Sequence, residues 1–163
     1  MYVQVVGRPG ARLSLPHPSA KFKVSPQLEP RGCGMSITYT IDHARRLVTA
    51  VGQGDLTGDD IFGYQQEVWS RPDVGGYDEL MDMTNVQRID LRSVDHVKQL
   101  AELAASMDPV AVQSKFAIVA PEDYAFGLGR MYESYRRLEG RSTKRVGVFR
   151  SMAEALAFLE ADG

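Results

Sequence analysis

The sequence of 163 residues contains one cysteine, Cys33, so an internal disulfide is excluded and a reducing compartment is expected. It contains no apolar run near the roughly 20 residues that a membrane-spanning helix needs. Prolines interrupt the N-terminal residues early, which argues against a signal peptide. We therefore expect a cytoplasmic protein of one folded domain, because 44% hydrophobic and 25% charged residues are ordinary for a globular chain.

Histidine is also scarce, and this limits the catalytic and metal chemistry that can be proposed. The three histidines are His17, His43 and His96, and no G-x-S-x-G motif is present to carry a nucleophilic serine. The acidic stretch at 55–60 lacks the glycine and the glutamate that an EF-hand loop needs. We interpret Thr57 and the aspartates after it as a helix cap, and we expect neither a metal nor a cofactor.

Charge and proline are unevenly distributed along the chain. Residues 1–34 hold five basic residues, one acidic residue and five of the eight prolines. This composition predicts an irregular or disordered basic arm, which we expect to be inert rather than a contact for an acidic partner or nucleic acid. The domain itself should span 35–161, and a net charge of −2 argues against specific nucleic-acid binding.

From residue 36 onward the pattern alternates strands and helices. Strands are predicted at 36–42, 45–54, 77–83, 115–120 and 145–149. Helices are predicted between Thr57 and Pro72 and at 94–107, 121–140 and 151–160. The order ββαβαβαβα predicts one α/β domain with a mostly parallel or mixed sheet, an N-terminal antiparallel hairpin and about four helices.

The predicted helix at 121–140 contains two glycines, each of which costs a helix interior about 1 kcal/mol relative to alanine. Close packing of this helix against the sheet is the favoured explanation. The alternative is that a ligand or partner approaches the backbone there. The residues of this candidate ligand site are Tyr124, Phe126, Gly127, Gly129, Arg130 and Tyr132.

Basic residues gather at the end of the same helix and just beyond it. They are Arg130, Arg136, Arg137, Arg141, Lys144, Arg145 and Arg150. We interpret them as a solvated surface, partly favoured by the helix dipole. The alternative is a patch that binds a phosphate, an anionic headgroup or an acidic partner.

The stretch MDMTNVQRIDLRSVD at 81–95 is dense in polar groups for a link between a strand and a helix. We expect the strand to end at 83 and a polar turn to lead into the helix that begins at Val94. Ser93 is a candidate N-cap for that helix. The candidate switch or partner-binding residues of this turn are Asp82, Thr84, Asp90, Arg92 and Ser93.

This turn and the element order resemble the STAS fold of the anti-sigma-factor antagonists, the SpoIIAA-like group, whose motif is D-L-S-x-V-x-x-I-D-S-S-G. The positions in register are Asp82, Thr84, Val86, Ile89 and Asp90. In that family a partner kinase phosphorylates the serine two residues after the second aspartate of the motif. That position is Arg92 here, so the resemblance implies a switch loop without its standard acceptor, although Thr84 or Ser93 could substitute. The segments 121–133 and 148–159 also look like small bacterial STAS/SEC14-type proteins of unsettled activity.

Three functions follow from these observations. The first is a non-catalytic cytosolic module that binds a protein partner through the turn at 84–96 and that could form a homodimer. The alternative is a small carrier or sensor of a lipid-like or anionic ligand, held at the candidate ligand site. The third, less favoured, is an unrecognised hydrolase or transferase that uses Asp82, Asp90 and Arg92.

Overall fold

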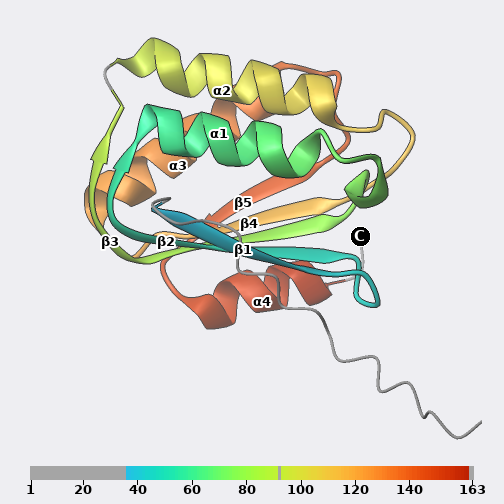
Figure 1. The fold of residues 1–163 in the computed structure, drawn as a ribbon, viewed down its shortest axis with the longest axis horizontal. Helices are drawn as coiled ribbons and strands as arrows, with labels where there is room; N and C mark the ends of the chain where they lie inside the picture. The colour runs from blue at the N-terminus through green and yellow to red at the C-terminus, as the bar shows by residue number, and fades with distance from the viewer. Residues whose placement is uncertain (1–35, 92, 162–163) are drawn as a thin grey trace, which may run out of the picture.

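The computed structural model describes residues 36–91 and 93–161, which form one five-stranded sheet with helices on both faces (Figure 1). The strands are β1 (Ile37–Asp42), β2 (Leu47–Thr57), β3 (Asp78–Asp90), β4 (Lys115–Val119) and β5 (Arg145–Phe149). The helices are α1 (Gly58–Trp69), the short 3₁₀ helix η1 (Pro72–Val74), α2 (Val94–Met107), α3 (Asp123–Leu138) and α4 (Met152–Glu160). This order confirms the predicted α/β fold. The predicted arm at 1–34, Cys33 and Arg92 lie outside the described residues.

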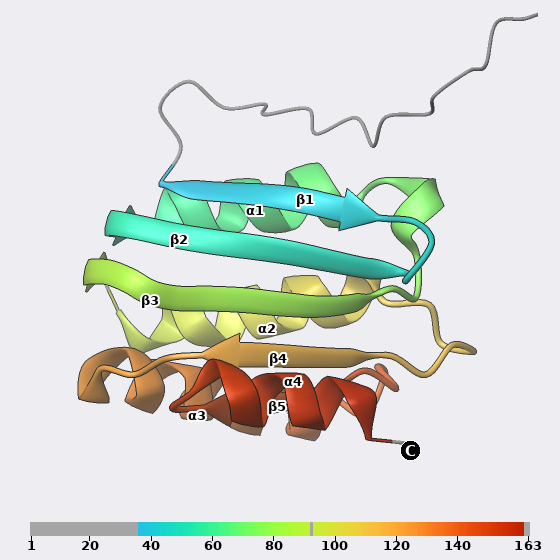
Figure 2. The same cartoon turned by 90° about the horizontal axis from the view of Figure 1, so that it is seen from below.

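The sheet has the order β1-β2-β3-β4-β5 and is mixed. β1 and β2 form the predicted antiparallel hairpin, and β2 to β5 are parallel. The crossover that joins two neighbouring parallel strands is almost always right-handed. From β2 to β5 each crossover leads to the next strand in the same direction across the sheet, so the crossover helices lie on the same face. Accordingly α1, α2 and α3 cover one face, while α4 lies on the other against β3, β4 and β5 (Figures 1 and 2).

The core lies mainly between the sheet and helices α1, α2 and α3. Its fully buried members include Ile37, Val48, Leu56 and Val68. A smaller cluster on the opposite face consists of Leu80, Ala117, Val119 and Ala155. β4 is therefore covered on both faces, as its continuous apolar run predicts.

β3 is much longer than the sequence pattern predicts. β4 pairs with it only from Glu79 to Asp82, but β2 remains paired with it as far as Asp90. The outer parts of β2 (residues 52–57) and β3 (residues 83–90) thus form a two-stranded extension, which we call the ribbon. The ribbon curls away from the sheet toward the beginnings of α1 and α2 (Figure 1).

Two expectations about this region were wrong. The strand does not end at residue 83, because Val86 and Ile89 are buried and the ladder to β2 continues past the polar Thr84. The glycines of β2 do not end that strand either. Gly52 lies within it, where a Cβ would come within 2.8 Å of Val86 Cγ2, and Gly54 takes a φ of +64° beside a register shift. The link to α2 is therefore only residues 91–93.

Candidate functional site

A cavity of about 90 Å³ lies between the sheet and helices α1, α2 and α3. Its apolar lining includes Ile61 of α1, Leu100 of α2, Leu128 of α3, Met81 of β3, Ile118 of β4 and Leu56 of the ribbon. The amphipathic helices and the face of the sheet that they cover both point apolar side chains into this layer. The periodic apolar residues of the sequence therefore form the walls of the cavity. The cavity has the mostly apolar character that is typical of small-molecule sites.

Small residues on α3 help to make room for the cavity. Ala125 and Gly129 both line it. A Cβ at Gly129 would lie 2.9 Å from Val148 Cγ1, so this glycine lets α3 pack closely on β5. The packing explanation is therefore confirmed for Gly129. It does not account for Gly127, where a Cβ would meet no atom of the described residues within 4 Å.

The structure brings only part of the predicted ligand site together. Gly129 and Tyr132 line the cavity, but Tyr124 is 60% exposed to solvent. Phe126 lies beneath the Arg150 guanidinium, with 4.1 Å between the guanidinium carbon and the ring centroid. Arg130, the one charged residue of the predicted site, has an exposed side chain that forms an ion pair with Glu133 on the same helix.

The polar groups of the cavity gather around Glu79, at the beginning of β3. Glu79 is 3% exposed, and the Tyr64 hydroxyl donates a hydrogen bond of 2.8 Å to its Oε1. Burial raises the pKa of Glu79 above its usual value, and the nearby Lys144 ammonium opposes that shift. Burial likewise raises the pKa of the Tyr132 hydroxyl. Gln65 completes this set, and its amide Nε2 donates a weak hydrogen bond of 3.7 Å to Met107 Sδ.

Sequence reasoning missed Glu79, Tyr64 and Gln65. One signal was present, because Glu79 is a charged residue inside the short strand YDELMDM, which is otherwise expected to be buried. A buried carboxylate needs a partner. Such a residue in a predicted core strand therefore indicates a polar site, although the sequence alone does not name the partner.

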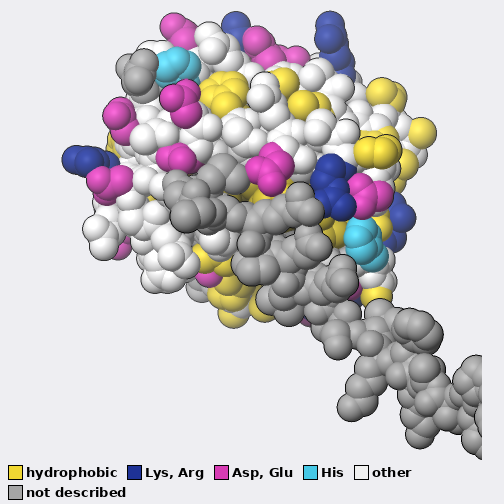
Figure 3. Space-filling view, in the orientation of Figure 1, with side chains coloured by type: hydrophobic (Ala, Val, Ile, Leu, Met, Phe, Trp, Pro, Cys, Tyr) yellow, Lys and Arg dark blue, Asp and Glu magenta, His cyan; other side chains and the backbone are white. Residues whose placement is uncertain are grey.

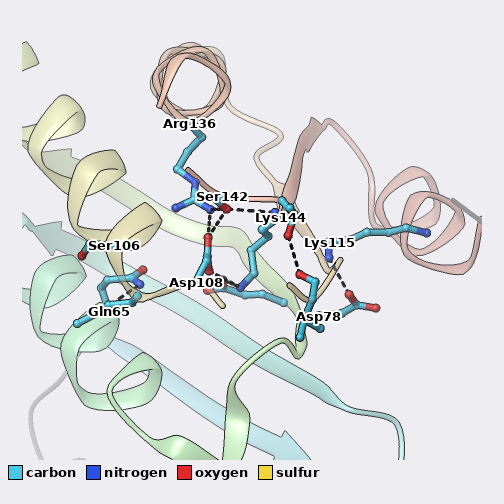
Figure 4. Close-up of polar contacts among 12 residues, drawn as sticks. Gln65, Asp78, Ser106, Asp108, Lys115, Arg136, Ser142 and Lys144 are labelled. Carbon is cyan, nitrogen blue, oxygen red and sulfur yellow. Dashed lines mark hydrogen bonds and ion pairs between the residues drawn. The ribbon is translucent and has the colours of Figure 1, made fainter. Parts of the chain in front are cut away.

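Next to Glu79, a network of buried charges joins the helix layer to the sheet (Figure 4). Asp108, just after α2, forms an ion pair with Arg136 of α3 and accepts a hydrogen bond of 2.5 Å from the Ser142 hydroxyl. Lys144 Nζ lies 3.6 Å from Asp108 Oδ1 and 3.8 Å from Glu79 Oε2. These four charges therefore balance within the protein interior.

The basic run is divided among separate environments. Arg136 and Lys144 have side chains only 2% and 4% exposed, so for these two residues the solvated-surface interpretation is wrong. Arg130 and Arg137 both pair with Glu133, and Arg150 pairs with Asp123. On the face seen in Figure 3, basic side chains are likewise scattered rather than gathered into one patch.

Three of the predicted switch residues, Asp82, Thr84 and Asp90, lie along β3 rather than in a turn. Asp82 accepts hydrogen bonds from the Thr84 backbone N–H at 2.9 Å and the Thr84 hydroxyl at 2.5 Å. Asp90 is exposed at the end of the ribbon. The two carboxylates are eight positions apart along the strand, a contour of about 26 Å. The structure thus does not support a catalytic site in which Asp82 and Asp90 act together.

A surface cleft of about 330 Å³ lies where α1 and α2 begin, lined in part by Asp59, Asp90 and His96. The two helices begin differently. Thr57 and Asp60 form a complete capping box on α1, and the Thr57 hydrogen bonds lower the pKa of Asp60. Ser93 occupies the N-cap position of α2, as predicted, but its side chain makes no capping hydrogen bond.

Two features are absent from the described residues. No helix there has both the length and the apolar character that a bilayer crossing requires. Within residues 36–91 and 93–161, no group of three or more His, Cys, Asp or Glu side chains is arranged to hold a metal ion.

Comparison with known proteins shows the fold of the chain. No protein-family model matches the sequence, and no curated protein does. The chain is similar to the crystal structure of an uncharacterized protein of the DUF3478 family with a SpoIIAA-like fold, from Shewanella loihica PV-4. The TM-score is 0.50 at 14% sequence identity, over 78% of this chain and 97% of that chain. The chain thus has a SpoIIAA-like fold, which confirms the architecture that the resemblance implied.

Proposed function

We propose that this protein is a non-catalytic binding module that holds a small, largely apolar ligand in the cavity beneath α1, α2 and α3. The cavity is the observation that carries the proposal, because apolar walls with a few convergent polar groups are the usual form of a ligand site. This favours the carrier or sensor alternative. Because a cavity of about 150 Å³ holds benzene, a volume of about 90 Å³ fits a small molecule rather than a long-chain lipid.

Ligand binding can be tested by filling the cavity. Ala125 is 6% exposed and lines the cavity, so Ala125→Leu places additional carbon atoms into it. Ala153→Leu is the matched control, because Ala153 is an exposed helical residue on α4, on the opposite face of the sheet. A ligand that binds only the folded state raises stability by about 2.7 kcal/mol at a hundredfold excess over Kd.

The experiment screens a panel of small apolar compounds by thermal unfolding of the wild-type chain and both variants. We expect a subset to raise the Tm of the wild type and of Ala153→Leu, and to leave Ala125→Leu unchanged. A panel that shifts none of the three, or that shifts Ala125→Leu equally, contradicts the proposal.

Binding of a protein partner at 84–96 is the second candidate function. It is favoured by the surface at the start of α2, where Val94 is 54% exposed and the helix lacks a side-chain cap. If this surface binds a partner, Val94→Asp should abolish crosslinks formed in the cell. Val110→Asp, at a position that is 73% exposed in the loop after α2, should preserve them. Equal crosslinking of the two variants would remove this candidate.

The resemblance leaves Thr84 and Ser93 as candidate phosphorylation sites, and Ser93 is the better acceptor of the two. The Thr84 hydroxyl donates to Asp82 at 2.5 Å, so a phosphate there would be repelled by a neighbouring carboxylate. Ser93 is exposed at a helix N-terminus, where a phosphate is favoured by the helix dipole. Phosphopeptide mapping of protein from its own host distinguishes the two positions.

A further inference from the structure

We infer that the ligand of the cavity is a small neutral molecule that carries a hydroxyl group, such as a short-chain alcohol, and that it is not a carboxylate. This inference rests on the proposed function and specifies the ligand of the same site. It follows from Glu79, the one charged side chain among the described residues of the lining, and from the hydrogen-bonding groups around it.

Among the described residues that line the cavity, Glu79 is the only charged one, and it is 3% exposed. A carboxylate ligand would bring a second negative charge beside it, away from solvent that could screen the two. Like charges in such a site are strongly unfavourable. The cations that accompany Glu79 do not line the cavity and are already engaged, since Lys144 and Arg136 both contact Asp108.

A cationic ligand is also disfavoured. Lys144 Nζ already lies 3.8 Å from Glu79 Oε2, so the carboxylate is not an unpaired charge that awaits a partner. An ammonium group would lose its hydration among apolar walls, which is strongly unfavourable. The balanced pairs Glu79–Lys144 and Asp108–Arg136 would then carry one surplus positive charge.

A hydroxyl group matches the hydrogen-bonding capacity that remains. Glu79 Oε1 accepts one bond, from Tyr64, and a carboxylate can accept several. Tyr132 lines the cavity, its hydroxyl is influenced by the charges of Arg136 and Glu79, and within residues 36–91 and 93–161 this hydroxyl forms no hydrogen bond. An alcohol can donate to Glu79 and accept from Tyr132 at the same time.

The apolar body of the ligand would then lie along β3, toward the ribbon. Met81 and Met83 follow Glu79 on the same face of the strand and line the cavity, as does Ile89 farther along. With a volume of about 90 Å³, the cavity is smaller than the ~150 Å³ that holds benzene. An alcohol of roughly three or four carbon atoms, which has fewer non-hydrogen atoms than benzene, is the matching size.

The test compares 1-butanol, butyrate and butylammonium at neutral pH, because these probes share one apolar body and differ in head group. Binding is followed by NMR through the methyl groups of Met81 and Met83, with ¹³C-labelled methionine in the full chain. We expect saturable shifts with butanol and an affinity at least about tenfold higher than for either ion, a difference of about 1.4 kcal/mol. Ala125→Leu should abolish these shifts, and Ala153→Leu should retain them.

Tyr132→Phe supplies a second variant that keeps the ring and the fold. It should weaken butanol binding several-fold and leave the weak binding of butyrate unchanged. Butyrate or butylammonium binding as tightly as butanol would overturn the inference while the proposed function stands. Equal butanol affinity in the wild type and Tyr132→Phe would also overturn it. No saturable shift with any probe would contradict the inference and the proposed function together.

Discussion

The layer between the sheet and helices α1, α2 and α3 has two differently built ends. At one end the charges of Asp108, Arg136, Lys144 and Glu79 fill the space with directed contacts. Toward the ribbon, apolar side chains surround a cavity. Buried charges must each find a partner, so the charged end has little freedom, whereas apolar walls make no directed bonds and can leave a space. Under the proposed function, the charged end holds the helices in place and the apolar end receives the ligand.

The largest predicted effect comes from breaking the charged end. Asp108→Ala leaves the buried Arg136 guanidinium without its carboxylate, and loss of one partner of a buried pair costs about 3–5 kcal/mol. Urea denaturation measures the change in the free energy of unfolding. Asp55→Ala is the matched control, since it breaks an ion pair with Arg88 whose side chains are 54% and 72% exposed. This control should cost less than about 1 kcal/mol. Similar losses in the free energy of unfolding of the two variants would show that the charged end does not hold the helices in place.

A smaller effect is predicted for the two glycines of α3, the helix that spans both ends. Gly129→Ala brings a Cβ within 2.9 Å of Val148 Cγ1, and such overpacking costs about 1–3 kcal/mol. Gly127→Ala meets no steric barrier and should stabilise the helix by about 1 kcal/mol. Thermal unfolding should therefore move the Tm of the two variants in opposite directions. Two increases in Tm would mean that α3 is free to move away from β5.

The helix starts near the ribbon provide a third test, with a still smaller effect. Thr57→Ala removes the hydroxyl that accepts from the Asp60 backbone N–H and donates to the Asp60 carboxylate, and should cost about 1 kcal/mol. Ser93→Ala removes a side chain that makes no capping bond, so its free energy of unfolding should change by no more than a few tenths of a kcal/mol. Urea denaturation of both variants measures the difference. A loss at Ser93 equal to that at Thr57 would show that α2 is capped in solution.

The pH dependence of stability gives the smallest effect and tests Glu79, where the two ends meet. Because burial raises its pKa in the folded state, Glu79 contributes stability that is fully present below its ordinary pKa and is lost as pH rises through the raised value. The free energy of unfolding of the wild type minus that of Glu79→Gln should therefore increase as pH falls.

Asp60 provides the opposite control for this pH experiment. Hydrogen bonds from Thr57 lower the pKa of Asp60, so its contribution is present above the ordinary carboxyl pKa and is lost as pH falls through the lowered value. The difference between the wild type and Asp60→Asn should therefore decrease as pH falls. Two differences with the same slope would contradict the assignment of Glu79 as a carboxylate disfavoured by burial.

Local patterns in the sequence predicted most of the fold, because each strand and helix is encoded by its own periodicity. α2 spans the predicted residues, and Ser151 and Glu154, whose spacing in the sequence is that of a capping box, form one at the start of α4. β3 was predicted too short because its outer half depends on pairing with β2, which a local pattern does not show.

The candidate site was predicted less well, for a related reason. Gly129 and Tyr132 could be singled out because a glycine in a helix is unusual. The burial of Asp108, Arg136 and Lys144 could not be predicted, because it depends on contacts between distant parts of the chain. A run of basic residues in the sequence does not show which of its members point inward.

The ribbon also creates a third open strand edge, in addition to those of β1 and β5. Beyond Asp82, β3 has no strand partner on the β4 side within the described residues. Such an edge is a template on which another chain can assemble into aggregates, and proteins protect it with bulges and charged side chains. This edge has both, since the ladder shifts register twice and Arg88 and Asp90 are exposed. The polar residues along 84–90 therefore also protect the protein from edge-to-edge aggregation.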